Sequence, residues 1–280
     1  MSCYDLNMIE TLTLNQAIER CPSIAATEPA AKASKQYNFI STLNILNSAL
    51  DNDWLIRSVK GTGSRHGMHN VALVHKSQVE KSVIEGFPQV NIVNSHNLTK
   101  RFSTVLGFFR LVCSNGLVAP TGMMTSVQPT LHRLSSGKSI TEDINSTLEK
   151  AFGQYDTIVN QTQLLKERQL TEEERTYLAR YAYYIRFRYR MSQPKKVDAT
   201  AILAPRRDVD AGTDLWTTFN VIQENLTQGG NRIGTGITRV QDDLKFNQEL
   251  WTGVDKALLH RDSDLETTLK ALFRKKQKTN

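Results

Sequence analysis

The sequence predicts an α+β protein with one antiparallel sheet at about residues 54–113. In this range, short strand-like apolar segments are separated by turn-forming residues, and outside it apolar residues follow helical spacing. We expect a single domain over residues 1–260. Its expected parts are an N-terminal helical segment (1–53), the antiparallel sheet (54–120) and a larger C-terminal helical region (139–260), followed by a basic amphipathic tail (261–280).

Four strands are expected, and short polar or glycine-containing segments connect them. They are Trp54–Lys60, His69–Lys76, Gln89–Asn94 and Phe102–Cys113. Short connections between consecutive strands favour antiparallel pairing. The connection at residues 61–67 (GTGSRHG) has no bulky apolar anchor, which predicts a mobile tip.

Helix starts are indicated by side chains that can accept backbone N–H bonds. Capping-box spacing occurs at Thr13–Gln16, Ser139–Glu142 and Thr171–Glu174, and Ser41 is a further N-cap candidate. Later helices are expected from Ile144 to Leu165, after Thr171, and over Asp214–Leu226, Thr238–His260 and Leu265–Phe273. Gly229-Gly230 predicts a helix stop that is followed by a mobile connection.

Composition excludes a membrane protein and a disordered chain. Apolar residues make up 39% and aromatic residues 8%, and the longest near-continuous apolar run, Val105–Cys113, is half a bilayer span and contains an arginine. The opening residues lack a basic segment followed by an apolar one, so no signal peptide is expected. The three cysteines have no CxxC spacing, which indicates a reducing cytoplasm.

Motifs for catalysis, nucleotide binding and metal binding are weak. Gly61-x-Gly63 is followed by Arg65 and not by the GK[ST] of a phosphate-binding loop. Carboxylates in the sheet region are too few for a two-metal nuclease. The histidines near the sheet, His66, His69, His75 and His96, lack the spacing of metal ligands. We therefore expect no enzymatic activity, no metal and no cofactor.

Positive charge is concentrated in blocks. The net charge is +7, but residues 54–140 contain 10 basic and 2 acidic side chains, and residues 175–207 contain 9 and 1. Clustered positive charge is typical of proteins that bind polyanions. The alternative is a solvated surface that is balanced by the acidic segments between these blocks.

The segment at residues 175–190, RTYLARYAYYIRFRYR, contains five arginines and five tyrosines. On a helix, its packing face is expected to contain Leu178, Tyr181, Ala182, Ile185 and Tyr189. Beside that face, Arg175, Arg186 and Arg190 form a stripe, with Tyr183 at its edge. Arginine beside tyrosine suits single-stranded nucleic acid, because guanidinium groups bind phosphates and rings stack on bases. The alternative is that the tyrosines belong to the core and the arginines pair with the carboxylates of residues 172–174 or of other acidic segments.

Three strings carry a resemblance to a known family. They are VNIVNSHN (90–97), GFFRLVCSNGLV (107–118) and LWTTFNVIQENLTQGG (215–230). Together they resemble a phage/plasmid-like family of uncharacterised proteins, a domain-of-unknown-function family. The resemblance implies an origin in a bacterial virus or plasmid, and hence the cytoplasm of the bacterial host cell. It implies no activity and no catalytic residue.

Charge and resemblance together predict a non-catalytic DNA-binding protein of a phage or plasmid. We expect it to bind or anneal single-stranded DNA in replication or recombination, and to form a homo-oligomer through its alternating charged blocks. The alternative is a non-enzymatic protein that binds and inhibits a host defence or other host machinery. The expected nucleic-acid-binding residues are Arg57, Lys60, Arg65, Lys100, Arg101, Arg175, Tyr183, Arg186, Arg190, Arg206 and Arg207.

Overall fold

The chain forms two compact units, Met1–Thr157 and Ile158–Asn280, in a computed structural model. The structure describes residues 10–34, 37, 39–77, 86–110, 116–117, 155–187, 198–230 and 233–278. The α+β prediction is confirmed, since the first unit holds an antiparallel sheet with N-terminal helices and the helical region follows. The sequence predicted one domain over residues 1–260, whereas the sheet and the helical region lie in separate compact units.

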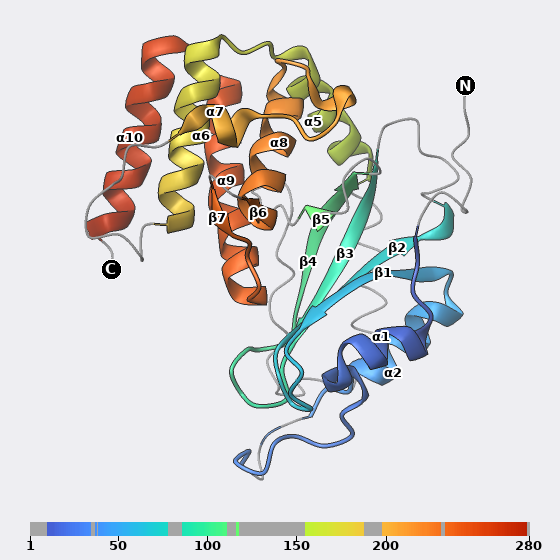
Figure 1. Cartoon of the computed structure of the whole chain (residues 1–280). Helices are drawn as coiled ribbons and strands as arrows, with labels where there is room; N and C mark the ends of the chain where they lie inside the picture. Colours follow the sequence, from blue (N-terminus) through green and yellow to red (C-terminus); the bar gives the residue numbers. More distant parts are fainter. Residues whose placement is uncertain are drawn as a thin grey trace. The chain divides into compact units, whose positions relative to one another are not determined.

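The sheet of the first unit is a meander in which every strand pairs antiparallel with the next along the chain (Figure 1). Its strands are β1 (Trp54–Gly61), β2 (His69–His75), β3 (Gly86–Asn94), β4 (Ser103–Arg110) and β5 (Gly116–Leu117). The four predicted strands are confirmed, although β3 begins earlier than expected. The β1–β2 register shifts between Ile56 and Ser58, so Arg57 sits at a bulge.

Two short helices contact β1, namely α1 (Leu14–Arg20) and α2 (Thr42–Asp51), and a 3-10 turn, η2 (Pro22–Ala25), follows α1 (Figure 1). The predicted capping box at Thr13 is confirmed, because its hydroxyl accepts from Gln16 N while the Gln16 side chain accepts from Thr13 N. The Ser41 hydroxyl caps α2 by accepting from Asn44 N. The core of this unit contains Ile24, Leu46, Ile56, Leu73 and Ile92, all fully buried.

The second unit is helical. Its elements are α5 (Tyr155–Glu167), α6 (Glu172–Phe187), α7 (Ala199–Leu203), the 3-10 turn η3 (Asp208–Asp210), α8 (Leu215–Gln228), the two-stranded ladder of β6 (Gly229–Gly230) and β7 (Gly234–Thr235), α9 (Val240–Leu259) and α10 (Asp262–Lys278). The predicted helices that begin after Thr171, Asp214 and Thr238 are confirmed. The predicted capping box at Ser139 lies outside the described residues. No described helix is long and apolar enough to cross a membrane.

Helix α8 is almost entirely buried: residues 215–226, most of the string LWTTFNVIQENLTQGG, are all buried. Its polar side chains have partners inside the protein: Gln223 Nε2 donates to Asn247 Oδ1 at 3.2 Å, and Asn225 Nδ2 donates to the carbonyls of Ile202 and Ala204 at 2.9 Å each. This string is therefore a core helix whose polar groups fix its neighbours.

The segment after α8 and the C-terminal tail differ from their predictions. Gly229 ends α8 as expected, but it begins an ordered ladder where a mobile connection was expected. Its φ of +76° suits glycine, and a Cβ there would lie 2.2 Å from Gly234 O. The expected short helix of the tail spans Asp262–Lys278 and contacts α6 and α9, with Leu265 and Leu269 buried.

Candidate nucleic-acid interface

Four of the predicted binding residues meet at one end of the sheet. β1 ends beside the start of β2, which lies beside the end of β3, because Gly61 pairs with His69 and His69 with Asn94. The β1–β2 and β3–β4 connections therefore lie at the same end (Figure 1). We call this the basic end, and its residues are Lys60 at the close of β1, Arg65 in the first connection, and Lys100 and Arg101 in the second.

Backbone hydrogen bonds join the two connections. His96 N donates to His66 O at 3.0 Å, and Ala30 N donates to His96 O at 2.8 Å. Within the second connection, Lys100 N donates to Ser95 Oγ at 2.8 Å, and Ser95 Oγ donates to Lys100 O at 2.9 Å. Residues 61–67 were expected to be a mobile tip, but His66 connects them to the β3–β4 connection by a backbone hydrogen bond.

The basic end is exposed where its charges are concentrated. Arg65 and Arg101 are exposed, while Lys60 and Lys100 are half-buried. Among the described residues, no carboxylate pairs with Arg65, Lys100 or Arg101. This end therefore carries a surplus of positive charge that is available to an anion.

A buried chain of hydrogen bonds lies beneath this end; we call its residues, Ser23, Thr42, His69 and Asn94, the polar cluster. Asn94 Nδ2 donates to Thr42 Oγ1 at 3.0 Å, and Thr42 Oγ1 lies 2.8 Å from His69 Nε2. His69 Nδ1 lies 3.1 Å from the carbonyl of Gly67, which can only accept. We therefore assign the proton to Nδ1, so that Thr42 donates to Nε2.

Burial of the His69 ring lowers its pKa to about 4, against a weaker opposing effect of the Gly67 carbonyl. The ring is therefore neutral at physiological pH. Ser23 Oγ also lies 2.9 Å from Nδ1, and all four side chains of the polar cluster are fully buried. Since no part of the cluster reaches solvent, its role is to hold the ends of β2 and β3 in place.

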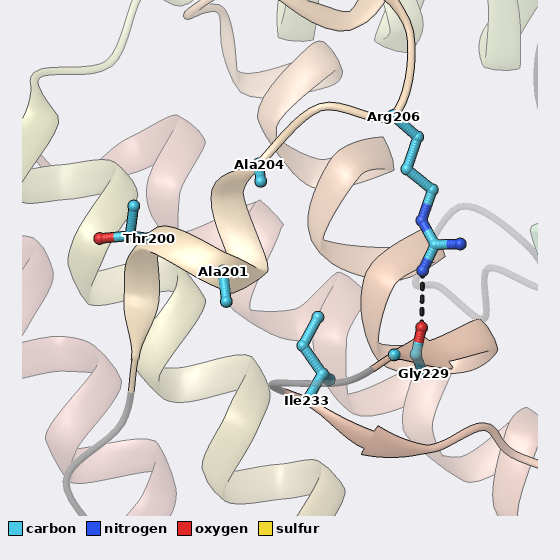
Figure 2. Close-up of a pocket in the computed structure, with 7 residues that line it drawn as sticks. Thr200, Ala201, Ala204, Arg206, Gly229 and Ile233 are labelled. Carbon is cyan, nitrogen blue, oxygen red and sulfur yellow. Dashed lines mark hydrogen bonds between the residues drawn. The ribbon is translucent and has the colours of Figure 1, made fainter.

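Arg206 and Arg207, predicted to bind nucleic acid, are engaged inside the second unit. Arg206 donates from Nε to Asn225 Oδ1, from one terminal nitrogen to Gln228 Oε1 and from the other to Gly229 O, each at 2.7 Å. Figure 2 shows the last of these bonds beside a hollow of about 360 Å³, which α7 and the β6–β7 segment line.

Arg207 forms ion pairs with Asp210, at 2.9 Å, and with Glu224. Both of these carboxylates are nearly fully buried. Removing its guanidinium would leave two buried carboxylates without their ion-pair partner. The contacts of Arg206 and Arg207 therefore favour a structural role.

The arginine and tyrosine helix is confirmed as α6, and its predicted packing face is buried as far as Ile185. Arg175 pairs with Glu172 at 2.9 Å, which is the alternative that the sequence left open. The ring of Tyr183 packs on Phe187, with 4.6 Å between the ring centroids. Arg190 lies outside the described residues.

Arg186 connects α6 to the end of α8 and to β7. Its Nε donates to Leu226 O at 3.3 Å, and a terminal nitrogen donates to Thr235 O at 3.1 Å. The guanidinium also lies 4.9 Å from the centroid of the Phe187 ring. These contacts stabilise the helical unit, so we do not include Arg186 in the candidate interface.

Arg186→Ala should therefore lower the free energy of unfolding by about 1–2 kcal/mol, because two carbonyls lose a charged donor. The salt dependence of any DNA binding should stay that of the wild type. The matched control is Arg180→Ala, an exposed arginine of the same helix, which should change stability by less than about 0.5 kcal/mol. Urea denaturation and a salt titration of binding measure both quantities; a changed salt slope with unchanged stability would restore Arg186 to the interface.

Sequence reasoning missed the residues that shape the basic end. Ser95 and Asn97 organise the second connection, and Thr42 and Asn94 join α2 to the sheet. The spacing Asn97-x-Thr99 is a local signal for a side-chain-capped turn. No comparable local signal marks the Thr42–Asn94 contact.

Comparison with known proteins gives a consistent family match. A family model described as "Domain of unknown function (DUF932)" matches residues 30–251. The chain is 28% identical to UPF0380 protein YafZ of Escherichia coli (strain K12), covering 88% of this chain and 92% of the relative. It is 27% identical to UPF0380 protein YfjQ of the same organism, with the same coverage. No solved structure matches.

Proposed function

We propose that the chain, which belongs to the family described as "Domain of unknown function (DUF932)", binds single-stranded nucleic acid at the basic end of its sheet. The observation that carries this proposal is the convergence of Lys60, Arg65, Lys100 and Arg101 on that end. Ammonium and guanidinium groups there can bind successive phosphates of one strand. The role is non-catalytic binding.

Aromatic residues beside the charges favour a single strand over a duplex. Tyr37 and Phe39 are both half-buried at this end: the Tyr37 hydroxyl donates to Ser95 O at 3.4 Å, and the Phe39 ring lies 4.8 Å from the His96 ring, centroid to centroid. Proteins that bind single strands combine a positive surface with rings on which bases stack. Such a surface suits a phage or plasmid protein that anneals single-stranded DNA. In this proposal, the protein acts as a homo-oligomer in the cytoplasm of the bacterial host.

Binding is tested with labelled single-stranded and double-stranded oligonucleotides over a series of salt concentrations. Arg65→Ala and Arg101→Ala should each weaken binding to all sequences and reduce the salt slope on single strands by about 0.7 for each lost phosphate contact. Their melting temperatures should match the wild type, because neither side chain has a described partner in the protein.

Lys76→Ala is the matched control. Lys76 follows β2 at the opposite end of the same sheet, where it pairs with Asp53 at 2.6 Å. Its loss should leave DNA affinity and salt slope unchanged. If the wild type fails to bind any oligonucleotide at low salt, the proposal is wrong, and an acidic host protein becomes the partner to seek.

A further inference from the structure

Leu98, in the connection between β3 and β4, combines two unusual properties. Its side chain is 44% exposed, and its backbone φ is +67°. Leucine is disfavoured at positive φ, where the strain is about 1–3 kcal/mol and where glycine and asparagine are the usual residues. Among the described residues, the other exposed large apolar side chains, Leu164, Val209 and Leu259, have ordinary φ values.

Hydrogen bonds on both sides of Leu98 impose this conformation. Asn97 Oδ1 accepts from Thr99 N at 3.2 Å and from Thr99 Oγ1 at 2.6 Å, which closes a tight turn around Leu98. Outside that turn, the paired bonds between Ser95 and Lys100 clamp the connection. The leucine is therefore fixed in an outward position.

The surroundings of Leu98 are positively charged. Lys100 and Arg101 lie two and three residues after it. The β1–β2 connection, which contains Arg65, is joined to the β3–β4 connection by the bond from His96 N to His66 O. An exposed apolar side chain beside cations that pair with no described carboxylate suits a ligand with an anionic backbone and flat apolar surfaces. A nucleic acid strand has both, with phosphates outside and base faces between them.

We propose that Leu98 inserts between neighbouring bases of the bound strand and unstacks them while the adjacent cations bind the phosphates. This inference rests on the proposed function and deepens it. Apolar wedges of this kind, leucine among them, part stacked bases in other nucleic-acid-binding proteins. A rigid connection favours insertion, because the side chain loses little further freedom on binding.

The test uses single-stranded oligonucleotides that carry 2-aminopurine, an adenine analogue whose fluorescence rises when it loses its stacking neighbours. Wild-type protein should raise this fluorescence on binding. Leu98→Asn should bind with an unchanged salt slope, because the phosphate contacts remain, and with an affinity lower by roughly tenfold at most. It should lose the fluorescence rise.

Asparagine is chosen because it accepts positive φ more readily than leucine. The melting temperature of Leu98→Asn should therefore equal or exceed that of the wild type, so a loss of signal cannot come from misfolding. Leu259→Asn is the control, since Leu259 is 72% exposed at the end of α9 in the other unit. It should keep the full fluorescence rise.

Each outcome decides a separate claim. If the wild type binds without a fluorescence rise, or if Leu98→Asn keeps the rise, the wedge is wrong and the binding function stands. If the wild type does not bind at low salt, the proposed function itself fails. If Leu98→Asn binds as tightly as the wild type and alone loses the rise, Leu98 acts on base stacking only.

Discussion

Replacing Glu174 with alanine should lower the free energy of unfolding of the second unit by about 3–5 kcal/mol. The Glu174 carboxylate pairs with Arg168, and both side chains are at least 95% buried. It also accepts from Thr171 N at 3.0 Å and from Asp262 N at 2.9 Å, which attaches α10 to the start of α6. Its removal leaves the buried Arg168 guanidinium without its carboxylate partner and two backbone donors without their acceptor.

Glu172→Ala is the control, because Glu172 lies in the same turn but is 74% exposed in its pair with Arg175. An exposed pair contributes about 0–1 kcal/mol, so this variant should be close to the wild type. Urea denaturation in a Trp54→Phe background separates the units, since Trp216 and Trp251 then report the second unit alone. Equal stabilities of the two variants would contradict the structural role of Glu174.

The same carboxylate predicts loss of stability in acid. Burial alone would raise the pKa of Glu174, but the hydrogen bonds from Arg168, Thr171 and Asp262 outweigh it and lower this pKa. The unfolded state therefore takes up the proton first as pH falls. The stabilisation is present above the ordinary pKa of a glutamate and disappears as pH falls through the lowered value.

Acidification should destabilise the first unit at a higher pH through His69. Burial lowers the pKa of its ring from 6.5 to about 4. Between these two pH values, His69 is protonated in the unfolded chain but neutral in the folded chain. Its contribution to the free energy of unfolding is therefore greatest above pH 6.5 and falls towards pH 4. The full loss is about 3 kcal/mol, from 1.36 kcal/mol for each pKa unit.

His69→Gln removes this titration and should flatten the stability profile between pH 6.5 and pH 4. The change should be absent from His260→Gln, which replaces a half-buried histidine of the second unit. Trp54 fluorescence, in a background where Trp216 and Trp251 are phenylalanine, follows the first unit. An unchanged slope in His69→Gln would show that another group carries the acid sensitivity.

Most elements of the fold were predictable because their signals are local. The Thr13, Thr171 and Asp214 side chains each bond a backbone N–H three residues ahead, so the sequence shows both partners together. The packing face of α6 follows from helical spacing alone. The β6–β7 ladder was missed because residues 229–236, GGNRIGTG, are rich in glycine and lack the apolar pattern that marks a strand.

The sequence predicted which residues lie at the basic end, but it also predicted binding residues that the structure places elsewhere. Lys60, Arg65 and Lys100 were expected at strand ends, and antiparallel register brings such ends together. An arginine that binds phosphate looks the same in sequence as one that binds a carbonyl. The partners of Arg186 lie 40 and 49 residues further along the chain, which no local pattern shows. The positive φ of Leu98 likewise cannot be predicted from the sequence, because it depends on the hydrogen bonds that close the turn around this residue.

The order of the strands also determines how quickly the first unit can fold. Each strand pairs with the next along the chain, and the most distant paired residues of β1–β3 are His69 and Asn94. Short separations keep the entropy of loop closure small, which speeds folding. The sheet can therefore grow strand by strand during synthesis, and the contact of Asn94 with Thr42 completes the polar cluster as soon as β3 is in place. The residues that form this buried hydrogen-bond network are thus all translated before the helices of the second unit, so the network can form without them.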